Sequence, residues 1–135
     1  MRNTHVYASH MGALMSNSAS NYILYRALVG RVIATHRARL GLQQPEMATR
    51  LGIVQASLSR IETGHATASI EQLAMAADVF RTSPAALLAE ADRAAALMEA
   101  QGWKVVRSST QAPADWTPLG AVVLAGLLLA LALSS

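Results

Sequence analysis

Three side chains that hydrogen-bond well to nucleic-acid bases occur close together in the middle of the chain: Gln55, Ser59 and Arg60. The amide of Gln55 matches the N6/N7 edge of adenine, and the guanidinium of Arg60 matches O6 and N7 of guanine. A helix that begins at Gln55 places these side chains on one face with Ala56, whose methyl group can pack on a thymine methyl. The spacing predicts a helix that presents base-reading groups to the major groove of duplex DNA.

Two hydroxyl side chains of the same stretch, Ser57 and Thr63, can donate hydrogen bonds to backbone phosphates. Such contacts set the register of a protein on the duplex and carry no sequence information. Polar side chains are equally common on helix faces that only meet water. For Ser59 both interpretations stay open.

No cluster of residues in the sequence suggests catalysis. The chain has no cysteine, and its four histidines lack the spacing of metal ligands. It also lacks a nucleophile–base–acid arrangement and a phosphate-binding loop. We therefore expect a protein that is not an enzyme, that holds no metal or cofactor, and whose sequence implies no small-molecule ligand.

The charge is divided unevenly along the 135 residues. Residues 1–60 hold seven basic side chains and one acid, a formal charge of +6, whereas residues 61–135 hold four basic and seven acidic side chains, a charge of −3. The basic half contains the base-reading stretch, as a phosphate-binding surface requires. Charge alone would fit an ordinary solvated basic helix equally well.

Apolar periodicity and capping residues predict five helices that position this stretch. Gly41, Gly52 and Gly64 supply stops or tight turns, and Ser69 with Gln72 has the form of a capping box. The predicted helices are 21–40, 43–51, 55–63, 70–80 and 84–101. On the first helix we expect Val29, Ile33, Leu40 and the stem of Arg37 to share one face.

The second and third predicted helices form a helix-turn-helix around Gly52. Ala48 is small enough for the two helices to cross closely. Gln43 and Val54 precede these helices where a capping serine or threonine would be usual, which costs about 0.5–2 kcal/mol each. The residues expected to be buried are Met47, Leu51, Leu58 and Ile61.

The motifs extend over all five helices. They are Val29-Gly30, Ile33 and Arg37; Leu42, Gln44 and Glu46-Met47-Ala48; Leu51-Gly52; Ser57-Leu58-Ser59, Ile61-Glu62 and Gly64; Ser69-Ile70 and Leu73; Ser83-Pro84 and Leu87. In these motifs residues 29–88 resemble the Cro/C1-type helix-turn-helix domain, also called the Xre family.

The resemblance implies an all-α fold, a five-helix lambda-repressor-like DNA-binding domain over residues 21–101. It also implies that Gln44 grips a phosphate and that Arg37 and Glu62 form a structural ion pair. With all five elements matched, the DNA-reading interpretation of Gln55 and Arg60 is favoured over a solvated face. One short recognition helix covers only a few base pairs, so a homodimer on a two-fold site of double-stranded DNA is expected.

The two ends of the chain differ from this domain in composition. Residues 1–20 are small and polar and are predicted to form a flexible arm, and residues 102–117 a linker with a short extended piece near 103–107. Residues 118–134 are predicted to form a C-terminal hydrophobic helix. No charge occurs from 116 to 135, a length of about 30 Å as a helix, close to the thickness of a hydrocarbon core.

Two interpretations of the hydrophobic helix remain. It can anchor a cytoplasmic DNA-binding domain to the bacterial inner membrane, which we favour. Alternatively the protein is soluble in the cytoplasm and the helix joins subunits, because a helix that is apolar on all sides must be covered. The function expected is a sequence-specific transcriptional regulator, a repressor rather than an activator. The alternative is an antitoxin-like or adaptor protein whose C-terminal helix mediates oligomerisation or partner binding.

Overall fold

The computed structural model describes residues 21–108, which form five helices and a two-stranded parallel sheet. The five predicted helices are confirmed, with ends that differ by a few residues. In chain order the elements are β1 (Tyr22–Leu24), α2 (Tyr25–Arg39), α3 (Gln44–Arg50), α4 (Gln55–Glu62), α5 (Ile70–Val79), α6 (Pro84–Ala100) and β2 (Lys104–Val106).

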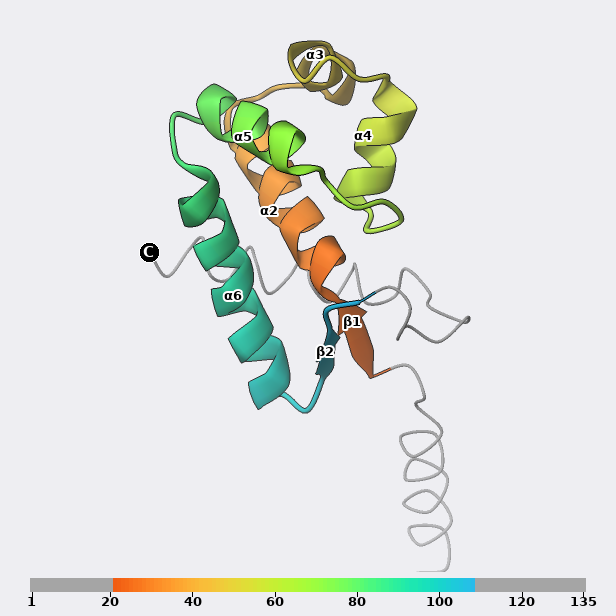
Figure 1. Ribbon diagram of the computed structural model, residues 1–135, viewed down its shortest axis with the longest axis vertical. Coiled ribbons are helices and arrows are strands. Elements are labelled where there is room, and N and C mark those ends of the chain that lie inside the picture. Colours follow the sequence, from red (N-terminus) through yellow and green to blue (C-terminus); the bar gives the residue numbers. More distant parts are fainter. Residues whose placement is uncertain (1–20, 109–135) are drawn as a thin grey trace, which may run out of the picture.

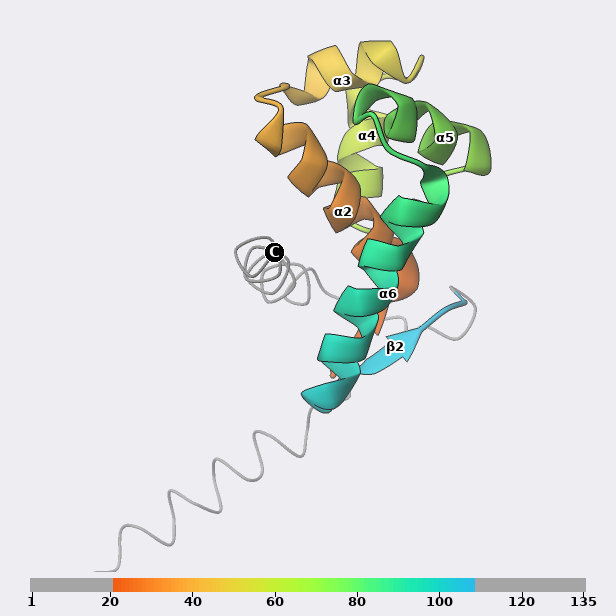
Figure 2. The same cartoon turned by 90° about the vertical axis from the view of Figure 1, so that its left-hand side faces the viewer.

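Helices α2 and α6 lie side by side and form the long axis of the domain (Figures 1 and 2). Most of the residues that α6 buries are alanines, which allow the helix to approach its neighbours closely, whereas α2 buries larger aliphatic side chains. The largest fully buried side chains include Leu28, Ile33, Leu58, Leu87 and Met98, so one core joins α2, α4 and α6.

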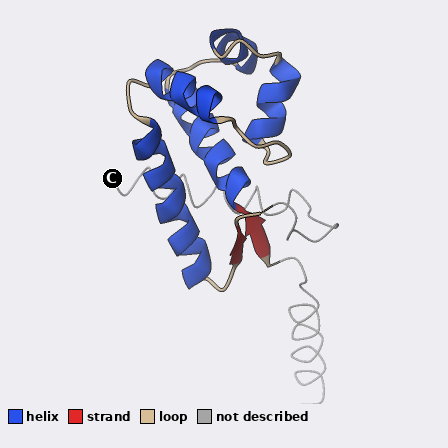
Figure 3. Ribbon diagram, viewed as in Figure 1, coloured by secondary structure: helices blue, strands red, loops and turns tan. Residues whose placement is uncertain are grey.

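The two strands lie at the opposite end of the domain from α3 (Figure 3). Tyr22, Ile23 and Leu24 pair in parallel with residues 104–106, and all three are buried. The prediction that the first helix starts at Asn21 is therefore wrong, because the chain is extended as far as Leu24. The extended piece predicted near residues 103–107 is confirmed as β2.

Local sequence explains most of the helix ends. The capping box at Ser69 is present: its hydroxyl accepts from the N–H of Gln72, whose side chain accepts from the N–H of Ser69. Ser83 caps α6 through the N–H of Ala86. Gln43 and Val54 make no side-chain cap, as expected from their types.

The expected position of Leu40 on the packing face is wrong. Its side chain is 54% exposed, because α2 ends at Arg39 and the chain reverses at Gly41, whose φ is +69°. Val29 and Ile33 are buried as predicted.

Two predicted parts of the chain lie outside the described residues: the arm at 1–20 and the hydrophobic helix at 118–134, together with residues 109–117 of the linker. Within residues 21–108, no helix combines the length and apolarity needed to cross a membrane.

Candidate nucleic-acid interface

Helices α3 and α4 meet at a tight turn that is closed by backbone hydrogen bonds. The N–H groups of Gly52 and Ile53 donate to the carbonyls of Thr49 and Ala48 at 3.1 and 3.0 Å. Gly52 has a φ of +68°, a conformation that suits glycine. Ala48, with Met47, is buried where the two helices meet.

The inner face of α4 holds the helix against the core. Leu58 and Ile61 are buried, as are Met47 and Leu51 on the α3 side of the turn. With these side chains turned inward, the orientation of α4 is set by packing and does not depend on a ligand. The opposite face is therefore presented to solvent in one defined arrangement.

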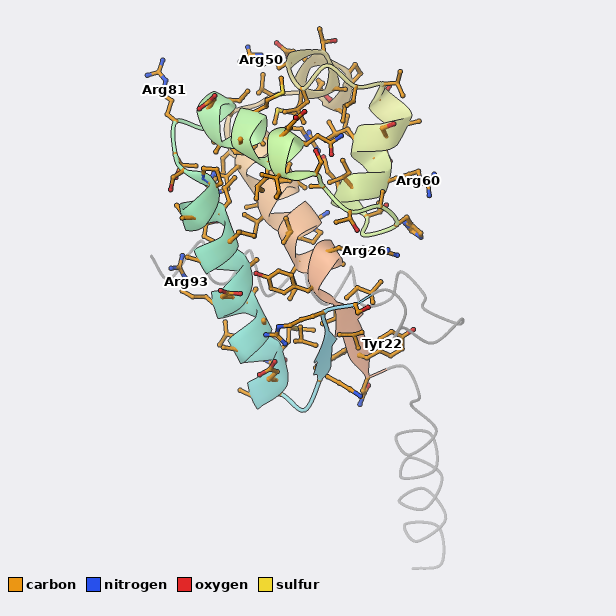
Figure 4. All side chains as sticks on the ribbon, in the orientation of Figure 1. Tyr22, Arg26, Arg50, Arg60, Arg81 and Arg93 are labelled. Carbon is orange, nitrogen blue, oxygen red and sulfur yellow. The ribbon has the colours of Figure 1, made fainter. Side chains whose placement is uncertain are left out.

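The outer face of α4 carries the residues predicted to read bases. Gln55, Ala56 and Arg60 are exposed, and Ser57 and Ser59 are half-buried. Figure 4 shows Arg60 projecting away from the domain, on the side opposite Arg81 and Arg93. Arg26, from the start of α2, projects on the same side as Arg60.

Thr63, predicted to donate to a phosphate, already uses its hydroxyl within the protein. The Oγ1 atom donates to the carbonyl of Ser59 at 2.8 Å and lies 2.8 Å from Nδ1 of His65. The hydroxyl has a single proton, which it already donates to the carbonyl of Ser59. Thr63 can therefore donate to a phosphate only if it gives up that hydrogen bond.

Arg37 and Glu62 form an ion pair that ties α2 to the end of α4. The Nε atom of Arg37 lies 2.9 Å from both carboxylate oxygens, and its Nη2 lies 2.8 Å from Oε1. Glu62 is 2% exposed, and Nη1 of Arg37 donates to the carbonyl of Leu42 at 2.7 Å. These charge-assisted bonds fix the C-terminal end of α4 against the loop that leads to α3.

Gln44, the residue assigned to a phosphate by family resemblance, also belongs to this cluster. It is half-buried at the start of α3, and its amide nitrogen donates to Oε1 of Glu62 at 3.3 Å. One amide hydrogen therefore orients the side chain and the second hydrogen remains for another acceptor.

A residue that sequence reasoning missed holds the segment after α4. The Nε atom of Arg26 donates to the carbonyl of Gly64 at 2.8 Å, across 38 residues of sequence. Gly64 is buried and has a φ of +81°. No local sequence pattern predicts this hydrogen bond, because it joins the start of α2 to the loop that follows α4.

The crossing of α2 and α4 is closest at Gly30. A Cβ atom built on Gly30 would lie 1.9 Å from the carbonyl oxygen of Ile61 and 2.9 Å from its carbonyl carbon. Only a residue without a side chain allows α4 to approach α2 this closely.

Comparisons with known proteins identify a helix-turn-helix domain in this chain. Residues 28–91, which run from α2 into α6, match the model of a family described as a helix-turn-helix domain. The crystal structure of the clp gene regulator ClgR from Corynebacterium glutamicum is similar to the chain, with 31% identity and a TM-score of 0.56, over 59% of this chain and 85% of that one. A second crystal structure of ClgR has 30% identity and a TM-score of 0.49, over 53% and 92%. No curated protein matches the chain.

Proposed function

The chain belongs to the helix-turn-helix domain family, and we propose that it is a sequence-specific DNA-binding regulator of transcription of the Cro/C1 (Xre) type. The proposal names a regulator and not an enzyme, and its partner is double-stranded DNA. One observation carries it: α4 is held rigidly by buried Leu58 and Ile61 while Gln55, Ala56 and Arg60 on its outer face are exposed.

The outer face of α4 supplies the base contacts in this proposal. Arg60 donates to guanine, Gln55 pairs with adenine, and Ala56 packs on a thymine methyl. Ser59 is half-buried and reaches only a base that comes close to the helix. Each good bidentate contact discriminates against the wrong base by about 1–3 kcal/mol.

The phosphate contacts come from the flanks of α4. Gln44, already oriented by Glu62, directs its second amide hydrogen to one strand. Ser57 contacts a second phosphate. Thr63 contacts that phosphate as well only if its hydroxyl leaves the carbonyl of Ser59. The N-terminus of α4 has no side-chain cap, so its first N–H groups can donate to a phosphate.

We further propose that the protein binds as a homodimer to a two-fold operator and represses transcription in the cytoplasm. A recognition helix of 8 residues reads only a few base pairs, and a second copy doubles the site. Repression is the simpler outcome, because a dimer bound over a promoter excludes polymerase without further contacts.

A selection from random duplexes, followed by mobility-shift titration, tests the base assignments. Arg60→Ala should weaken binding to the selected operator by about five- to a hundredfold while leaving the fold intact, because Arg60 is exposed. Arg93→Ala is the matched control, since Arg93 is exposed on α6 and should leave affinity unchanged. Unaltered operator affinity in Arg60→Ala would refute the assignment.

In this proposal, residues 118–134 anchor the protein at the cytoplasmic face of the inner membrane. The 20 residues from Trp116 to Ser135 carry no charge, and Trp116 suits the interface between lipid and water. Fractionation of cells tests this: the full chain should pellet with membranes, and removal of residues 116–135 should release it. If the full chain is soluble and oligomeric, the hydrophobic helix joins subunits instead.

A further inference from the structure

A cavity of about 500 Å³ lies on the domain away from α3 and α4. It is open to solvent on one side and is lined by the end of β1, the first half of α2, the segment that leads into α5 with the start of that helix, Leu88 near the start of α6, and the end of β2 with the residues after it. Its volume falls in the range of about 300–1,000 Å³ that is usual for small-molecule sites. No residue of α3 or α4 lines it, so a ligand there does not occupy the proposed DNA contact, but its lining residue Arg26 also donates to the carbonyl of Gly64 just after α4.

The walls of the cavity are mainly aliphatic. They include Leu24, Val29, Leu73, Leu88 and Val106, which come from five different elements. Ile70, at the start of α5, also lines the cavity and is 86% exposed. Such a surface favours a ligand with an apolar body, because burial removes both surfaces from water.

The charged groups of the cavity are all of one sign. Arg26 and Arg107 line it, and none of the lining residues within the described range is acidic. Two carboxylates contact side chains that line the cavity: Asp92 accepts the hydroxyl of Tyr25 at 2.7 Å, and Glu99 lies 3.9 Å from Nη1 of Arg107 in an exposed pair.

Both guanidinium groups retain donors for an anion. Among the guanidinium nitrogens of Arg26, only Nε has a hydrogen-bond acceptor within residues 21–108, the carbonyl of Gly64. The guanidinium of Arg107 lies 5.7 Å from the centre of the Tyr25 ring, and its pair with Glu99 is longer than a hydrogen bond. The paired N–H donors of a guanidinium group match the two oxygens of a carboxylate.

We propose that this cavity binds a small amphipathic carboxylate, such as a medium-chain fatty acid, with its chain against the aliphatic walls and its head group on Arg26 and Arg107. A neutral apolar molecule would leave the guanidinium groups unmatched, and a cation would be repelled by them. Thr67 and Ser69 also line the cavity and add hydroxyl groups to it, although the hydroxyl of Ser69 already accepts from the N–H of Gln72.

Calorimetric titration of the full chain with decanoate, below its micellar concentration, tests the proposal, with decanol as the neutral probe. Decanoate should bind saturably at one site per chain, about tenfold or more tighter than decanol. In amide NMR spectra the largest shifts should occur at residues 67–70 and 106–108.

Three variants separate head-group recognition from general binding. Arg26→Met and Arg107→Met keep an apolar stem and should each weaken decanoate about tenfold without affecting decanol. Arg93→Met removes a charge from an exposed position outside the cavity and should change neither affinity. Because Arg26 also bonds to Gly64, thermal unfolding confirms that each variant folds, and Arg107→Met gives the answer if Arg26→Met does not fold.

Absence of saturable decanoate binding to the full chain would overturn the proposal. Equal affinities for decanoate and decanol, or shifts confined to other surfaces, would also overturn it. So would unchanged decanoate affinity in Arg107→Met.

Discussion

Single residues decide how α4 is held and what it offers to DNA. Glu62 is the centre of the cluster, since it accepts from Arg37 and from Gln44 while being almost completely buried. Among the base-reading candidates, in contrast, Gln55, Ala56 and Arg60 are exposed, and we expect them to contribute little to folding. Stability and recognition are therefore separated on opposite faces of one helix, so that variants of the two groups should differ sharply in effect.

Removal of one partner of the ion pair should destabilise the domain strongly. Glu62→Ala leaves the guanidinium of Arg37, 17% exposed, without its carboxylate, and a loss of about 3–5 kcal/mol in unfolding free energy is expected. The double variant Arg37→Met/Glu62→Met should recover part of that loss. Urea unfolding followed by circular dichroism measures both, with exposed Glu46→Ala as control. If the loss in the double variant equalled the sum of the losses in Arg37→Met and Glu62→Met measured singly, the two residues would not be coupled.

Gln44→Ala should weaken operator and random DNA by the same factor, because a phosphate contact is blind to sequence. Mobility-shift titrations with both duplexes give the ratio of the two affinities, which should match that of the parent protein. Gln43→Ala changes the exposed neighbouring amide and serves as the control. A change of the ratio would mean that Gln44 touches a base.

At the scale of elements, the crossing of α2 and α4 is the contact that positions the proposed interface. Gly30 lets the two backbones approach, and the Arg26–Gly64 and Arg37–Glu62 contacts lie toward the two ends of α2. All three contacts therefore hold the C-terminal end of α4 and the residues just after it, at Ile61, Glu62 and Gly64. A shift of α2 would displace the whole outer face of α4.

Gly30→Ala should lower the unfolding free energy by about 1–3 kcal/mol or more, because the added methyl group meets the backbone at Ile61 and not a flexible side chain. Chemical unfolding measures the loss. Ala38→Ser, at an exposed position of the same helix, should stay within about 0.5 kcal/mol of the parent. An equal effect in both variants would show that the close crossing is not what makes Gly30 necessary.

At the scale of the whole molecule, the first and last strands of the described domain pair with each other. The strands β1 and β2 pair although about 80 residues separate them, and Tyr25 at the start of α2 donates to Asp92 on α6 at 2.7 Å. Burial, followed by the hydrogen bond to Asp92, raises the pKa of the Tyr25 hydroxyl to about 12 from 10.0.

This pKa predicts a pH dependence of stability at alkaline pH. A raised pKa in the folded state means that the folded protein holds the proton more tightly, so the contribution is complete below pH 10 and disappears as pH rises to about 12. The urea concentration at the midpoint of unfolding, measured from pH 8 to 11.5, should fall less steeply with pH in Tyr25→Phe than in the parent protein. In Asp92→Asn the pKa should drop part of the way toward 10.0, since burial remains. Identical slopes in parent and Tyr25→Phe would rule this out.

The five helices, their capping residues and the turn at Gly52 follow from the sequence alone, because each depends on neighbours within a few residues. The inward residues of α3 and α4 follow from the same periodicity. Tertiary structure alone decided the extended conformation of Tyr22–Leu24, whose only ladder partner among the described residues is β2. It also decided the contact between Arg26 and Gly64, the clearance at Gly30 and the cavity, since these depend on segments that are distant in the chain and meet only when the core packs.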